Sequence, residues 1–246
     1  MTDPRQDHWR LQVHESVAST SDLCRALAAD GEPEGLAVLA RRQSQARGSR
    51  GRDWSSPEGN LSLSVLLRPR EPAHEAGQWS LLAAVAVADA LVQFLPDAGV
   101  LRLKWPNDVL LNGAKLAGIL VDAAAGPEGV LDWLVIGIGV NLAVAPDVPR
   151  RRVACLADIV PPPTPEAFAV PLLDRLHHWR LVRARHGFGP IRAAWLERAP
   201  ATGSEVTLRI GERRVIGGFA GLGDDGTLLL DADGRVRAFA AGEVLL

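Results

Sequence analysis

Polar side chains able to bind an anion, an amide or a metal ion are grouped in the stretch Lys-Trp-Pro-Asn-Asp-Val-Leu-Leu-Asn-Gly-Ala-Lys-Leu-Ala-Gly-Ile-Leu, residues 104–120. The group comprises Lys104, Asn107, Asp108 and Lys115. For any one of them, a solvated charge on a surface hairpin is the simpler interpretation. For the set it is weaker, because Lys115 begins an apolar run, 116–121, in which a lysine has little structural use. Together these residue types favour a site that neutralises and orients charged groups.

Turn chemistry predicts the elements around this group. The pair Asn112-Gly113 lies between two strand-like runs, and such a pair is typical of a type I′ hairpin because both central residues need a positive φ. Upstream, residues 101–104 alternate in polarity like a strand. Pro106 is expected to end regular pairing and to leave Asn107 and Asp108 on a loop.

A second informative stretch, residues 41–60, carries five arginines interleaved with glycines and has no apolar period. It is predicted to be a loop between strands at 36–40 and 61–67. Composition alone leaves open a solvated basic loop, an RNA-binding segment and a phosphate site. The two flanking strands and the stacking surface of Trp54 favour the phosphate site, since arginine binds phosphate in a bidentate manner and glycine lets backbone N–H groups approach.

These two stretches resemble the signatures of biotin protein ligases. Lys-Trp-Pro-Asn-Asp followed by Lys-Leu-Ala-Gly-Ile-Leu is the long and specific part of the likeness. The family's adenylate-binding loop usually runs Gly-Arg-Gly-Arg-x-Gly-Arg-x-Trp, and here it runs from Ala46 to Trp54. Ala46 replaces a glycine, and Ser49 stands where the family has its second arginine, which implies weaker retention of the reactive intermediate. The resemblance covers nearly the whole chain and implies the short form, without an N-terminal DNA-binding domain.

The resemblance implies two half-reactions. Biotin and ATP, with Mg²⁺, give biotinyl-5′-AMP and pyrophosphate, and a lysine of a biotin carboxyl carrier domain of acetyl-CoA carboxylase or a related carboxylase then displaces AMP. No tightly bound prosthetic group is implied.

Site residues carry over from the matched motifs. The expected catalytic residues are Lys115, Arg47 and Asp108. The expected contacts of biotin are Ser19, Thr20, Ser21, Gln43, Arg47, Gly48, Ser49, Lys115 and Gly118. The expected contacts of ATP are Arg50, Arg52, Trp54, Asn107, Asp108, Lys115 and Asn141. Asp108 is also the expected ligand of Mg²⁺, a hard cation usually bound by one or two carboxylates and substrate phosphates.

The rest of the sequence predicts an α+β protein in two domains. Residues 1–199 are expected to form a mixed-sheet catalytic domain of the biotin/lipoate ligase type, with helices on one face, among them a core helix over 78–94. After residue 200, short strands between Gly-rich turns, such as Asp225-Gly226, predict a small SH3-like barrel over 200–246.

Composition excludes several classes of protein. The formal net charge is −2, so no whole-protein field favours nucleic acid or membrane. The two cysteines, Cys24 and Cys155, lie in apolar settings without metal-ligand spacing, which suits a reducing compartment. The start lacks the apolar core of a signal peptide, and the most apolar run, 79–95, is interrupted by polar residues. We therefore expect a cytoplasmic protein with no DNA or membrane partner.

Alternatives remain at this stage. A lipoate or octanoate ligase has a related fold, although the two signatures argue against it. An RNA-binding protein could use the Arg-Gly loop, but a wider basic face and clustered aromatic residues are lacking. A DNA-binding biotin sensor would need an N-terminal module, for which the residues before Ser19 are too few. Some relatives pair through sheet edges, so a homodimer is left open.

Overall fold

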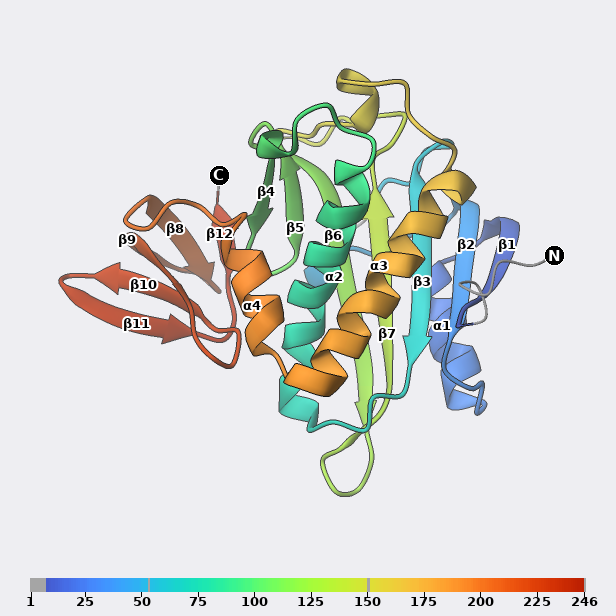
Figure 1. Cartoon of the computed structure of the whole chain (residues 1–246), viewed down its shortest axis with the longest axis horizontal. Helices are drawn as coiled ribbons and strands as arrows, with labels where there is room; N and C mark the ends of the chain where they lie inside the picture. Colours follow the sequence, from blue (N-terminus) through green and yellow to red (C-terminus); the bar gives the residue numbers. More distant parts are fainter. Residues whose placement is uncertain (1–7, 53, 150, 246) are drawn as a thin grey trace.

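The chain folds around a seven-stranded mixed sheet (Figure 1). The computed structural model describes residues 8–52, 54–149 and 151–245. In spatial order the strands are β1 (Arg10–Val17), β2 (Leu36–Gln43), β3 (Leu61–Leu67), β7 (Leu131–Val140), β6 (Ala114–Ala125), β5 (Asp108–Leu111) and β4 (Leu101–Lys104). The pair β1–β2 is parallel, and every other pair in this sheet is antiparallel.

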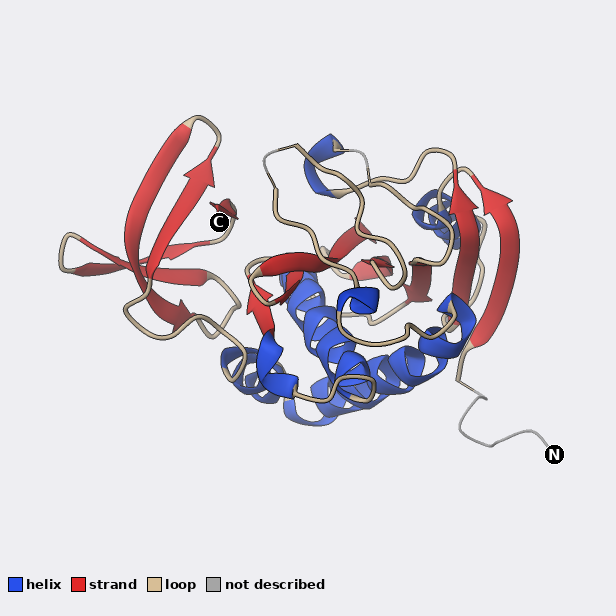
Figure 2. Cartoon of the chain, turned by 90° about the horizontal axis from the view of Figure 1, so that it is seen from above, coloured by secondary structure: helices blue, strands red, loops and turns tan. Residues whose placement is uncertain are grey.

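Two long helices cover one face of the sheet, and a shorter helix covers the other (Figure 2). α2 (Ala76–Val92) and α3 (Pro165–His186) pack on the first face, with α4 (Gly189–Leu196) beside them. α1 (Thr20–Ala29) packs separately, through Cys24 and Ala28, against Leu66 of β3. The expectation of helices on one face is therefore wrong for α1, because alternate residues of β3 are buried on both sides of the sheet.

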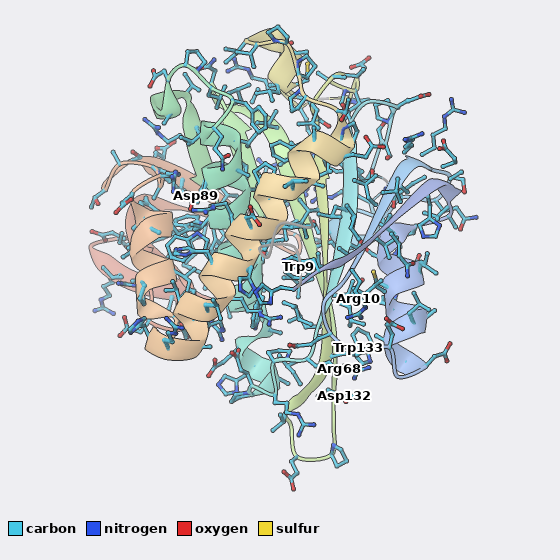
Figure 3. All side chains as sticks on the ribbon, turned by 45° about the vertical axis from the view of Figure 1, so that its right-hand side comes forward. Trp9, Arg10, Arg68, Asp89, Asp132 and Trp133 are labelled. Carbon is cyan, nitrogen blue, oxygen red and sulfur yellow. The ribbon has the colours of Figure 1, made fainter. Side chains whose placement is uncertain are left out.

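Arg68, just beyond β3, fastens α1 to the sheet. Its Nη2 donates to the carbonyl oxygen of Ala28 at 2.8 Å, and its Nε donates to that of Glu32 at 3.2 Å. Its Nη1 lies 3.4 Å from Oδ1 of Asp132, beside it in Figure 3. These contacts hold the C-terminal end of α1 against the sheet.

α2 is the central core helix, as predicted. The helical segment 73–92 is long and apolar enough, by composition alone, to cross a membrane, but 72% of that window is buried inside the protein. Its apolar residues pack on the sheet, so burial in the core accounts for them. α3 begins at Pro165, where Thr164 caps its first turn, and it continues through Pro171.

A second sheet follows the helices. It contains β8 (Glu205–Ile210), β9 (Arg213–Leu222), β10 (Leu228–Ala232), β11 (Arg235–Phe239) and β12 (Glu243–Leu245), in the order β11-β10-β9-β8-β12, and all its pairs are antiparallel. The predicted fold class, a mixed-sheet domain followed by a small antiparallel β unit, is confirmed. The strand β12 was not predicted, and the boundary at residues 199 and 200 stays a prediction.

The β5–β6 turn has the predicted geometry. Asn112 and Gly113 have φ values of 50° and 75°, as a type I′ turn requires. The expectation that Asp108 lies on a loop is wrong. Asp108 begins β5 and pairs with Lys104 across the β4–β5 hairpin, because the turn around Pro106, whose peptide bond is cis, uses only the residues between them.

Candidate active site

A cavity of about 250 Å³ lies over the face of the sheet that α1 covers in part. It collects side chains from α1, β2, β3, β6, β7 and the Arg-Gly loop that follows β2. Thirteen of the predicted site residues line it: Ser19, Thr20, Ser21, Gln43, Arg47, Gly48, Ser49, Arg52, Trp54, Asn107, Lys115, Gly118 and Asn141. Asp108 does not line it, and the side chain of Arg50 lies outside the described part of the chain.

The floor of the cavity is made by glycines of β6 and β7, which pair with each other and with serines of β3. Gly139 of β7 pairs with Gly118 of β6 on one side and with Ser62 of β3 on the other. A Cβ atom at Gly139 would lie 2.5 Å from the indole of Trp54, and one at Gly137 would lie 2.4 Å from Oγ of Ser21. Glycine is therefore required here by close approach, and the sheet is left with a trough where side chains would otherwise stand.

Hydroxyl groups converge at one end of this trough. Ser64 Oγ lies 2.8 Å from Oγ1 of Thr20 and 3.1 Å from Oγ of Ser21. Oε1 of Gln43 accepts hydrogen bonds from the backbone N–H of Thr20 at 2.8 Å and from its hydroxyl at 3.2 Å. Ser19 is the N-cap of α1, and its hydroxyl oxygen accepts from the backbone N–H of Asp22. The result is a small polar patch at the start of α1, where Ser19, Thr20 and Ser21 are only 2–7% exposed. Such a patch suits a compact neutral amide or urea group.

Lys115 stands at the other end of the trough with a buried counter-ion. Its Nζ lies 2.5 Å from Oδ1 of Asp108, whose Oδ2 lies 2.8 Å from Nζ of Lys104. Burial raises the pKa of Asp108, but the ammonium groups of Lys115 and Lys104 outweigh this effect and hold it below its usual value. Burial lowers the pKa of Lys115, and Asp108 partly opposes that change.

Lys104 and Lys115 are the only lysines among the 27 lysine and arginine residues of the chain. Every other cation is an arginine, yet lysine is kept at the two positions that contact Asp108. A compact ammonium fits this buried place, and the planar guanidinium of arginine differs from it in shape and hydration.

The Arg-Gly loop is folded back on itself over the cavity. The N–H of Trp54 donates to the carbonyl oxygen of Ala46 at 3.0 Å, and that of Gly48 donates to Arg52 at 2.7 Å. The Trp54 indole lies on the floor glycines, with Nζ of Lys115 5.4 Å from its ring centroid. Trp54 therefore forms part of the cavity wall beside Lys115.

Glu243 ties this loop to the second sheet. Its Oε1 accepts from Nη1 of Arg52 at 2.5 Å and from Nη2 of Arg151 at 2.9 Å, and its Oε2 accepts from Arg209. Burial raises the pKa of Glu243, but hydrogen bonds from Arg52 and Arg209 lower it more strongly, to about 2. Glu243 thus links β12, the last strand of the chain, to two arginines that line the cavity.

Two asparagines brace the cavity from the side. Nδ2 of Asn107 donates to the carbonyl oxygen of Ile119 at 2.7 Å, and Nδ2 of Asn141 donates to that of Ala154 at 3.1 Å. Both side chains are held by the backbone of elements that border the cavity. Their placement suits a positioning role for the cavity wall.

Sequence reasoning missed part of the site. The glycine floor gave only a weak Gly-x-Gly signal, which became specific once the pairing of β7 with β3 and β6 was known. Glu243 lies far from the motifs in sequence and had no local signal. The missed lining residues are Ser55, Ser62, Leu63, Ile119, Leu120, Gly137, Ile138, Gly139, Pro146, Val148, Arg151 and Val153.

Among the described residues, no Asp or Glu lines the cavity to bind a metal ion. Both oxygens of Asp108 face lysines, and Arg47 pairs with Asp22 and Asp122. Within the described ranges no three His, Cys, Asp or Glu residues are grouped as metal ligands. The arrangement therefore favours Asp108 as a counter-ion of the lysines over a ligand of Mg²⁺, and we assign no protein ligand to that ion.

The chain is similar in sequence and in fold to proteins of one known family. The family model described as biotin/lipoate A/B protein ligase matches residues 13–141. A biotin–[acetyl-CoA-carboxylase] ligase of Paracoccus denitrificans is 40% identical over 213 residues, which cover 84% of this chain and 88% of that protein. The bifunctional ligase/repressor BirA of Bacillus subtilis is 33% identical over 96% of this chain and 74% of that protein. The structure of a biotin protein ligase from Aquifex aeolicus in complex with biotin and ATP is similar, with a TM-score of 0.82 and 27% identity over 96% of this chain and 97% of that one.

Proposed function

Since this chain belongs to the biotin/lipoate A/B protein ligase family, we propose that it is an ATP-dependent, AMP-forming biotin protein ligase. It activates biotin as biotinyl-5′-AMP and transfers it to a lysine of a biotin carboxyl carrier domain. The observation that carries the proposal is the cavity itself, with a hydroxyl and amide patch at one end and a buried ammonium at the other.

The patch and the trough fit the two parts of biotin. Thr20, Ser21 and Gln43 supply donors and acceptors for the ureido ring, and the cavity beside the Trp54 indole admits a flat, apolar ring and chain. Trp54 lies along the wall beside Lys115. This placement suits the valeryl chain, whose carboxylate then reaches Lys115. We therefore assign Trp54 a wall role next to biotin as well as the expected role at the nucleotide.

Charge cancellation is the main demand of the first step. A carboxylate oxygen of biotin attacks the α-phosphorus of ATP, an acyl–phosphate bond forms, and the bond to pyrophosphate breaks. The nucleophile and the phosphate are both anionic, so fixed cations at the reacting atoms lower the barrier. Lys115 bridges carboxylate and α-phosphate in this proposal, and Arg47, Arg50 and Arg52 bind the phosphates.

The second step uses the same site. The uncharged amine of a carrier lysine attacks the carbonyl carbon of the mixed anhydride, and an amide bond forms. The bond between that carbon and the phosphate oxygen breaks, AMP leaves with the bonding electrons, and the nitrogen releases a proton to solvent. The Lys115 ammonium stabilises the charge that develops on the carbonyl and phosphate oxygens. In the first step, Mg²⁺ would neutralise the charge of the ATP triphosphate.

The test is a carrier assay. The protein is incubated with ATP, Mg²⁺, biotin and a biotin carrier domain, and the carrier is weighed by mass spectrometry. We expect a biotin adduct with the wild-type protein and with Arg213→Ala, which removes an exposed cation on β9. Lys115→Ala is expected to lose the adduct. An adduct with lipoate and none with biotin would assign the protein to the sister activity, and no adduct with either would overturn the proposal.

Partners and location follow from this activity. The acceptor in the proposal is the carrier domain of acetyl-CoA carboxylase or a related carboxylase, and the reaction is placed in the cytoplasm. We propose no operator binding, so a sequence-specific, salt-sensitive gel shift would contradict this part. The oligomeric state, for which a homodimer was left open, is tested by sedimentation.

A further inference from the structure

The guanidinium of Arg47 is held by two carboxylates from distant parts of the chain. Its Nη2 lies 2.9 Å from Oδ1 of Asp22, in the first turn of α1, and 2.8 Å from Oδ2 of Asp122 on β6. Neither aspartate lines the cavity, although Arg47 does. The side chains are 37%, 45% and 24% exposed for Arg47, Asp22 and Asp122, so the cluster lies at the rim of the cavity.

Both aspartates stand on elements that build the cavity. Asp22 follows directly on Ser21, whose hydroxyl belongs to the polar patch. Asp122 lies two residues beyond Leu120, which lines the cavity from β6. Arg47 therefore connects the element that carries the patch to the strand that begins with the Lys115 region.

Holding Arg47 also holds the loop that covers the cavity. The two chain neighbours of Arg47, Ala46 and Gly48, form the backbone hydrogen bonds that close the loop. Ala46 accepts from Trp54, and Gly48 donates to Arg52. Two glycines within the loop raise the entropy that must be lost when it is ordered. Side-chain ties at Arg47 offset that loss, and one carboxylate on each side restricts the guanidinium more than a single partner would.

We propose that Asp22 and Asp122 are positioning residues that hold the Arg-Gly loop over the biotin cavity through Arg47 and so slow the release of biotin. The proposal rests on the proposed function. It concerns residues that do not line the cavity, and Asp22 also pairs with Arg25 within α1, at 3.1 Å. Because the ion pairs are partly exposed, each contributes modestly and the pair together gives a several-fold effect.

The experiment measures the dissociation rate of biotin by chasing labelled biotin from the full-length protein. The variants are Asp22→Asn, Asp122→Asn and the double variant. Asp132→Asn is the matched control, because it removes an aspartate that also faces an arginine, Arg68, outside the cavity. We expect the double variant to release biotin about fivefold faster and each single variant about twofold faster, while Asp132→Asn matches wild type.

A second readout separates positioning from general destabilisation. The KM for biotin is expected to rise with the dissociation rate, while kcat at saturating biotin and the KM for ATP change less than twofold. In the ligand-free double variant, the amides of Gly48 and Trp54 are expected to exchange faster with deuterium, and those of β3 at the wild-type rate.

The Arg47→Ala background decides whether the aspartates act through Arg47. There the two aspartate substitutions are expected to have no further effect on biotin release. An unchanged release rate in the double variant would overturn the inference, and so would an equal effect with and without Arg47. Failure of the wild-type protein to bind labelled biotin would instead contradict the proposed function.

Discussion

Oδ1 of Asp108 lies 2.5 Å from Nζ of Lys115, where the two side chains are 9% and 17% exposed. The other carboxylate oxygen contacts Lys104. One carboxylate therefore separates two ammonium groups that would repel each other across a low-dielectric interior. Burial lowers the pKa of Lys115, and Asp108 opposes this effect, so the carboxylate maintains the charge that the first step needs.

Asp108→Asn tests this relationship. The substitution removes the group that raises the pKa of Lys115 and leaves burial and the charge of Lys104, which lower it. If the protonated form of Lys115 is required, the alkaline limb of the adenylation rate moves to lower pH. Pyrophosphate release measured against pH gives the result, and a limb at the wild-type position would contradict the counter-ion role.

The floor of the cavity gives a steric prediction. A Cβ atom at Gly139 would lie 2.5 Å from the indole of Trp54. Gly139→Ala is expected to displace Trp54 and to raise the KM for biotin at least tenfold, as roughly 1.4 kcal/mol of lost binding corresponds to tenfold. Gly126→Ala is the matched control, since its nearest contact would be an ordinary 3.7 Å. Thermal unfolding at the wild-type temperature shows that the fold is retained, and an unchanged KM would contradict the role of the floor.

The parts of the fold that were predictable carry a local signal. The Asn112-Gly113 turn follows from the conformational needs of its two residues, and the buried runs of β3 and β7 from their apolar sequences. Asp108 was misplaced because a proline suggested a loop, whereas antiparallel pairing resumes immediately after the turn.

The unpredicted parts depend on residues that meet only after folding. The trough exists because Gly139 and Gly118 occupy paired positions on neighbouring strands. Glu243 reaches Arg52 from a strand of three residues, which is too short for a periodic pattern. The family resemblance identified the motifs, but the pairs Arg47–Asp122 and Arg52–Glu243 appear in no motif.

Ser49 gives a prediction about the intermediate. It replaces an arginine of the family loop, and in this structure its carbonyl and hydroxyl oxygens accept hydrogen bonds from Arg52 at 3.2 Å. Ser49→Arg adds a cation beside the adenylate and is expected to reduce release of free biotinyl-AMP several-fold. The measurement separates bound from free adenylate by rapid filtration. An equal escape rate in the variant and the wild type would contradict the prediction.

The scarcity of lysine predicts how the protein responds to its own product. An acyl-adenylate that escapes the site acylates nearby uncharged amines, and both lysines of this chain are paired with Asp108. Arg151→Lys places an amine in the lining of the cavity and is expected to become biotinylated at residue 151 when the carrier is absent. Arg235→Lys, on β11, is the distant control. Peptide mass spectrometry compares the two, and equal labelling at both positions would contradict a local origin.

Glu243 gives a prediction about stability and pH. Its folded-state pKa is about 2, below the ordinary value of 4.5, because three arginines surround it. A depressed folded-state pKa stabilises the protein fully above the unfolded-state value, and the contribution is lost as pH falls from about 4.5 towards 2. The shift corresponds to about 3 kcal/mol as an order of magnitude.

Glu243→Gln removes this linkage. In the variant, the free energy of unfolding is expected to fall less steeply between pH 4.5 and pH 2.5 than in the wild-type protein, because one proton fewer is taken up on unfolding. Urea unfolding at a series of pH values measures it, with Glu205→Gln on the exposed part of β8 as the control. At neutral pH the variant also loses the ion pair between Glu243 and Arg52. A raised KM for ATP is therefore expected together with the lost stability. A slope equal to that of wild type would show that the arginines do not set the proton affinity of Glu243.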